Sequence, residues 1–205
     1  MGIYLPTITC PIDNQDVPTG AIETWHDVEY LLAKYYKESL YYSCTTRGYR
    51  HIDEFSKIID AVLNGVKTIY SEEVACLKID KLEHHLKILI EVEKVFMEQP
   101  KLVKNILLND EKTRYNLLEE YYKEKPKYKE HYKQRIQKIE TLNLANIYKK
   151  ATIQKEMSEF NLQDALKDDY HPVISTVYWL KTQLFLTKQA IKHKKALLHV
   201  MLSPI

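Results

Sequence analysis

Residues 172–202 read PVISTVYWLKTQLFLTKQAIKHKKALLHVML, and this stretch is the most apolar part of the chain. A stripe of apolar residues at helical spacing is typical of a helix that packs against a core. We therefore predict a long helix from His171–Pro172 to about Leu202, at the centre of a helical bundle. Its main face comprises Val173, Val177, Leu180, Leu184, Ile191 and Leu198.

A second apolar stripe predicts another helix nearer the N-terminus. Its members follow one another at spacings of three and four residues: Ile52, Phe55, Ile59, Val62, Val66 and Ile69. Asn64–Gly65 would end this helix early and leave 66–70 as a turn.

Helix-start signals, prolines and further apolar stripes divide the rest of the chain. A capping box at Thr24–Asp27 opens a helix for which Gly48 is a plausible stop. Further helices are expected over 72–98, 100–108, 111–123, 127–150 and 153–166.

Composition favours long helices, because 4 Gly and 7 Pro among 205 residues leave few turn-forming positions. The predicted fold class is therefore all-α, a single-domain bundle of about six to eight helices over residues 21–205. Residues 1–20 are expected to form an extended N-terminal arm, since Pro6, Pro11 and Pro18 exclude a helix there. The arm's large apolar side chains should be buried on this bundle or on a partner.

The cysteines and the ends of the sequence bear on location. Cys10, Cys44 and Cys76 are widely spaced, which favours neither a disulfide framework nor a zinc site. Residues 1–20 lack the basic start and the apolar core of a secretory signal, and no segment has the length and apolarity of a transmembrane helix. We expect an intracellular protein, most simply a cytoplasmic one.

Charge is distributed unevenly along the chain. Residues 1–111 carry 12 basic and 18 acidic side chains, a net charge of −6, whereas residues 112–205 carry 18 and 10, a net charge of +8. The basic half 112–205 is suited to an anionic partner. The alternative is that the two halves face each other or that both are simply solvated.

The most basic segment also contains tyrosines. Residues 112–150 carry 11 Lys or Arg against 5 Glu, with six tyrosines among them. Basic groups bind phosphates and aromatic rings stack on bases, so nucleic acid is one candidate partner, and an anionic membrane would use the same charges. Alternatively, the tyrosines lie on a buried stripe with Ile136 and Ile139. The candidate binding residues are Lys127, Tyr128, Lys129, Tyr132, Lys133 and Arg135.

Tyrosine is abundant throughout, with 16 Tyr against 4 Phe and 2 Trp. The doublets Tyr35–Tyr36, Tyr41–Tyr42 and Tyr121–Tyr122 place one ring of each pair away from the other on a helix. An outward tyrosine is typical of a protein interface. The sequence therefore favours a non-catalytic protein–protein interaction module, an adaptor, scaffold or regulatory factor, with a homo-oligomer as one form of it.

Signals for chemistry are sparse. The Glu23-x-x-His26 and Asp168-x-x-His171 pairs have metal-ligand spacing but lie at predicted helix starts, where capping explains their carboxylates. No nucleophile elbow, glycine-rich phosphate loop or dinucleotide fingerprint is present. We assign no catalytic, cofactor or metal residues. A helical enzyme or cofactor protein with an unrecognised site remains the second alternative, after nucleic-acid or membrane binding.

Overall fold

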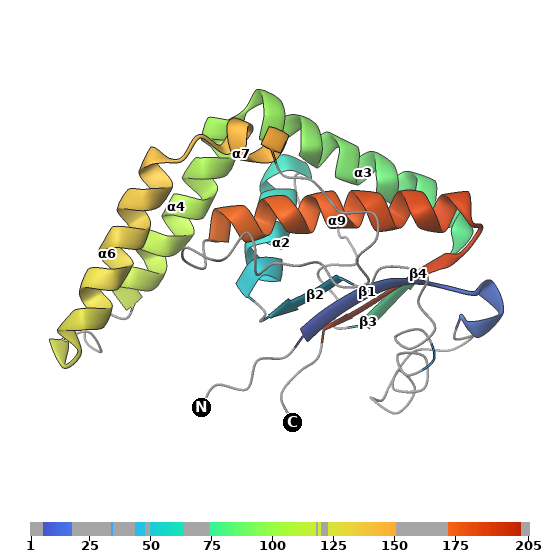
Figure 1. Ribbon diagram of the computed structural model, residues 1–205, viewed down its shortest axis with the longest axis horizontal. Helices are drawn as coiled ribbons and strands as arrows, with labels where there is room; N and C mark the ends of the chain where they lie inside the picture. The colour runs from blue at the N-terminus through green and yellow to red at the C-terminus, as the bar shows by residue number, and fades with distance from the viewer. Residues whose placement is uncertain are drawn as a thin grey trace.

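The computed structural model describes residues 6–17, 34, 44–47, 50–63, 74–117, 119, 123–150 and 172–201 (Figure 1). Within these ranges the chain is mostly helical, as predicted, and forms one domain. The predicted 153–166 helix, the tyrosine doublets and the arm boundary at residue 20 lie outside the described residues. Of the helix predicted from Thr24 to Gly48, the structure describes residue 34, which is helical, and residues 44–47, which form a strand, so this prediction is wrong for the last residues before Gly48.

A four-stranded antiparallel sheet accompanies the helices, in the order β2-β1-β4-β3. The predicted all-α bundle over residues 21–205 did not include this sheet, three strands of which lie in that range. Three of the strands are short apolar or β-branched runs, and such runs are too short for periodicity to identify before their partners are known. The strands are β1 (Pro6–Ile12), β2 (Cys44–Arg47), β3 (Val74–Leu77) and β4 (Ala196–Met201).

The last predicted helix divides in two. Helix α9 (Pro172–Lys192) ends in a turn that leads into β4. The Lys195 amide donates to the Ala190 carbonyl over 2.9 Å and the Lys194 amide to the Ile191 carbonyl over 3.1 Å, the pattern of a Schellman motif. Lys194 has a φ of 52° in this turn, a conformation that usually selects glycine. The usual sequence signal for the helix end is therefore missing.

Three further boundaries differ from the sequence prediction. Helix α3 (Ile79–Glu98) starts later than expected, because 74–77 form β3. Helix α4 (Pro100–Leu117) continues through the predicted break at Asn109–Asp110. The predicted 127–150 helix is two helices, α6 (Pro126–Thr141) and α7 (Leu144–Lys150), and the Asn143 side chain caps α7 by accepting a 3.0 Å hydrogen bond from the Asn146 amide.

The described part of the N-terminal segment is a central element of the fold. β1 pairs with β2 on one side and with β4 on the other, and a short 3-10 helix, η1 (Asn14–Asp16), follows it. Ile12 and Cys10 are buried. Of the large apolar side chains expected to be buried, Ile12 is therefore buried on the chain's own body, in an interior strand of the sheet.

The core lies between the sheet and the helices. Helix α9 lies along one face of the sheet, and α3 and α2 (Arg50–Leu63) pack against α9 (Figure 1). The α2 and α9 stripes predicted from sequence enter this core through Ile59, Val177, Leu180 and Leu184. Successive strand residues alternate between faces, so Cys10, Ile12 and Leu198 are buried on the opposite face of the sheet.

Shortening a buried side chain tests this packing. Ile59→Ala or Leu184→Ala should lower the free energy of unfolding by about 2–5 kcal/mol, because each removes apolar contacts and leaves a cavity. Ile79→Ala, at a partly exposed position on α3, is the control and should cost less than about 1 kcal/mol. Urea denaturation followed by circular dichroism measures all three. A loss below about 0.5 kcal/mol at Leu184 would contradict the placement of α9.

Candidate functional site

The basic segment forms a helical hairpin that projects from the core. Helices α4 and α6 lie side by side and extend away from the sheet (Figure 1). α4 packs against α2, α3 and α9 as well as against α6, so the core holds the hairpin through α4. The distal end, where α4 ends and α6 begins, carries Leu117, Glu119, Lys127 and Tyr128.

Ion pairs join the two helices of the hairpin. Arg135 Nη2 lies 3.2 Å from Glu111 Oε1, with side chains that are only 11% and 1% exposed. The Arg135 guanidinium also lies 5.3 Å from the centre of the Tyr132 ring, a cation–π contact. An exposed pair, Lys112 and Glu140 at 3.2 Å, flanks this buried one. The buried pair gives Arg135 a structural role between α4 and α6.

The six predicted binding residues lie on one helix but in different surroundings. Lys127, Tyr128 and Lys133 are exposed. Lys129 is partly buried and lies 3.8 Å from Glu119, while Tyr132 lies beneath Arg135. Ile139 is buried and Ile136 is partly buried, so the inner face of α6 follows the predicted stripe. The part of the predicted site that faces solvent is therefore Lys127, Tyr128 and Lys133.

Leu117 is also exposed near the distal end of the hairpin and was not predicted as a binding residue. Its side chain is 78% exposed and that of Tyr128 is 56% exposed, the two highest values among the exposed large apolar side chains of the described residues. A positional signal did exist: the buried α4 positions Val103, Leu107 and Glu111 recur every four residues, and position 117 falls off that stripe. We call Leu117, Lys127, Tyr128 and Lys133 the distal hairpin surface.

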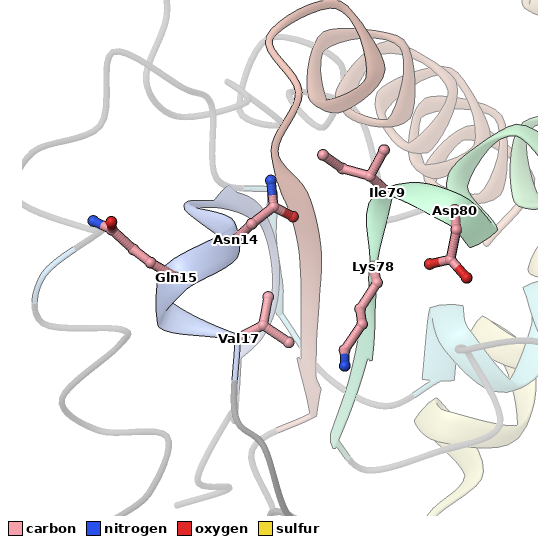
Figure 2. Close-up of a pocket in the computed structure, with 6 residues that line it drawn as sticks. All are labelled: Asn14, Gln15, Val17, Lys78, Ile79 and Asp80. Atoms are coloured by element: carbon pink, nitrogen blue, oxygen red, sulfur yellow. The ribbon is translucent and has the colours of Figure 1, made fainter.

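An open hollow of about 510 Å³ lies between η1 and the junction of β3 with α3 (Figure 2). Val17 and Ile79 supply apolar walls, and the exposed Lys78 and Asp80 supply one charge of each sign. Asn14 also lines it, but its Nδ2 donates to the Lys194 carbonyl over 2.6 Å. Because its charged groups are solvated and of opposite sign, this hollow offers little selectivity for a charged ligand.

A half-buried cluster of Tyr148, Glu93 and Lys181 joins α7 to α3 and α9. The Tyr148 hydroxyl donates to Glu93 Oε1 over 2.5 Å, and Lys181 Nζ lies 4.5 Å from the centre of the Tyr148 ring. Burial, then the hydrogen bond to Glu93, raises the pKa of Tyr148, and burial lowers the pKa of Lys181. The buried Tyr148 ring and its committed hydroxyl indicate a structural tie rather than a reaction centre.

The described thiols are poor nucleophiles. Burial raises the pKa of Cys10 to about 12 and that of Cys76 to about 11. Both therefore stay protonated at neutral pH, and the thiolate is the reactive form. Cys10 and Cys76 are free cysteines. Cys10 on β1 and Cys76 on β3 both lie opposite Leu198 on β4, the strand between them.

Metal ligation and membrane insertion find no support in the part of the chain that the structure describes. Those residues include no group of three or more His, Cys, Asp or Glu side chains placed to hold a metal ion. The Glu23/His26 and Asp168/His171 pairs lie outside them. Of the helices in the described ranges, none has both the length and the apolarity needed to cross a bilayer.

Comparisons with known proteins give no match. No protein-family model matches the chain. No curated protein and no solved structure is significantly similar to it. We therefore assign function from the side chains of the described residues and their surroundings alone.

The buried ion pair of the hairpin can be tested by removing one partner. Glu111→Ala should lower the free energy of unfolding by about 3 kcal/mol, because it leaves the Arg135 charge largely buried without this carboxylate. Lys112→Ala removes only the exposed pair with Glu140 and should cost less than about 1 kcal/mol. Equal losses in the two variants, measured by urea denaturation, would contradict a structural role for Arg135.

Proposed function

We propose that this protein is a non-catalytic interaction module, an adaptor, scaffold or regulatory factor, that binds another protein through the distal hairpin surface. The observation that carries the proposal is the exposure of Leu117 and Tyr128 on a hairpin that projects from the core. Apolar and aromatic side chains at the centre of a contact, surrounded by polar groups, are typical of protein interfaces. Lys127 and Lys133 supply such polar groups here.

A protein partner accounts for the hairpin better than nucleic acid does. Arginine makes the strong bidentate contacts to phosphate, and Arg135 instead pairs with Glu111 inside the hairpin. Lys129 lies close to Glu119, which reduces the positive potential there. Leu117, the most exposed large apolar residue in the described ranges, has no part in phosphate binding but suits an apolar depression on a protein.

Charge indicates the chemistry of the partner. Residues 123–141 carry seven Lys or Arg and three Glu, a net charge of +4. A partner with an acidic rim around an apolar depression would complement this surface, and opposite potentials speed association and exclude wrong partners. A second copy would bring its own positive hairpin to the contact, so like charges disfavour self-association through this surface.

The proposed interaction is intracellular. Cys10 and Cys76 are free thiols, which fits a reducing compartment. Burial and a raised pKa keep both thiols protonated, and therefore unreactive, at neutral pH.

A matched pair of variants tests the surface. Leu117→Ser/Tyr128→Ser removes the proposed contact, whereas Leu102→Ser/Ile79→Ser removes two exposed apolar side chains elsewhere. Each purified protein is immobilised and incubated with native lysate, with and without nuclease treatment, and the bound proteins are compared by quantitative mass spectrometry. We expect an acidic protein that binds the wild type and the Leu102/Ile79 variant and is reduced at least tenfold on the Leu117/Tyr128 variant, about 1.4 kcal/mol of binding free energy.

Three results would contradict the proposal. Identical recovery on both variants would place the contact outside the hairpin, and selective loss on the Leu102/Ile79 variant would move it to that surface. Recovery that disappears after nuclease treatment, with salt-dependent binding of a single-stranded oligonucleotide by the purified protein, would favour the nucleic-acid alternative for 112–205.

A further inference from the structure

Two histidines are buried where the sheet meets the helices. His199 on β4 is 0% exposed and His85 on α3 is 4% exposed. Most histidines keep an edge in water, where the ring can gain a proton as the pH falls. Burial of two imidazoles in one region is therefore unusual for a group that titrates near neutral pH.

A chain of hydrogen bonds holds His199 in place. Gln183 Nε2 on α9 donates to Thr9 Oγ1 on β1 over 3.1 Å, and Thr9 Oγ1 lies 2.9 Å from His199 Nδ1. All three side chains are buried. When the Thr9 hydroxyl donates to Nδ1, the chain runs in one direction from α9 through β1 to β4, and this arrangement requires a neutral imidazole.

The contacts of His199 that the structure describes are to uncharged side chains. From β1, Thr9 faces His199, and from α9, Gln183 and the Trp179 ring do, the latter with ring centres 6.2 Å apart. From β3, Ala75 lies opposite His199 in the register, so the thiol of the next residue, Cys76, is on the other face of the sheet.

Neighbouring histidines among the described residues oppose protonation of both rings. A positive His84 disfavours a charge on His85, and a positive His85 disfavours a charge on His199. His84 itself is exposed on α3. Each added proton therefore works against the next one as well as against burial.

We propose that His85 and His199 form an acid-sensitive latch between the sheet and its helices: a proton taken up by either ring opens this interface. β4 connects β1 to β3 in the sheet, and both α9 and α3 pack against it. Hydration of a charged imidazole therefore requires these elements to separate. The latch lies in the core and is independent of the distal hairpin surface.

The pH range of the latch follows from burial. Loss of water around the ring lowers the pKa of His85 to about 4 and that of His199 to about 3, from an ordinary 6.5. Between pH 6.5 and these values, the unfolded or opened chain binds protons that the closed form does not. Stability is therefore highest above pH 6.5 and falls as the pH decreases, by up to about tenfold in the unfolding equilibrium per histidine per pH unit.

Urea unfolding of the full chain at pH 7 and pH 5 tests the latch, because few carboxylates titrate in that interval. For a folded pKa of about 3 or 4, each histidine should raise the unfolding equilibrium constant by roughly twentyfold between the two conditions. We compare wild type with His85→Gln, with His199→Asn, whose side chain can still bond Thr9, and with His131→Gln at an exposed position on α6. The pH effect is the ratio of the unfolding equilibrium constant at pH 5 to that at pH 7. This ratio should be roughly twentyfold smaller in each core variant than in wild type and unchanged in His131→Gln.

The readout is the ratio of the unfolding equilibrium constants at pH 5 and pH 7 for one variant, so a loss of stability that is equal at both pH values does not affect it. If His199→Asn fails to fold, His85→Gln and an NMR titration of the wild-type imidazoles decide the matter. A pH effect that is the same in wild type and His85→Gln would overturn the latch. So would a protonation midpoint near 6.5 for either core histidine in the folded protein.

Discussion

The burial of β4 is the constraint on which the rest of the structure depends. Residues 196–199 are fully buried, and a buried backbone must satisfy its N–H and C=O groups within the protein. β1 does so along one edge and β3 along the other. The sheet therefore joins the beginning, the middle and the end of the sequence, and α9, which leads directly into β4, covers the resulting face (Figure 1).

This arrangement separates the core from the surface that we propose for binding. Apolar residues of α2, α3, α7 and α9 fill the interior together with Val103, Leu107 and Leu108 of α4 and Ile139 of α6. The distal residues Leu117 and Tyr128 lie outside this cluster. The Glu111–Arg135 pair and the inner face of α6 join the two hairpin helices. The distal end is therefore left to present Leu117 and Tyr128, and the buried histidines belong to a different part of the molecule.

The sequence predicts the parts of this fold whose signals are local. Regular apolar stripes predicted α2, the body of α3 and the central position of α9. Boundaries set by tertiary partners could not be found in this way. Lys194 takes a glycine-like conformation without being glycine, and a run such as 74–77 becomes a strand only because β4 lies beside it. The candidate site could not be predicted in full for the same reason, because only the structure reveals that Arg135 pairs with Glu111 inside the hairpin.

Amide hydrogen exchange by segment tests the central position of β4 most directly. If β4 is the strand on which the sheet depends, the amides of β4, β1 and α9 exchange only through global unfolding and share the largest protection, while the distal end of the hairpin exchanges faster. Exchange of the β4 amides at rates close to those of an exposed chain, with α9 still protected, would contradict the account. It would show that the helices form the stable unit without the sheet.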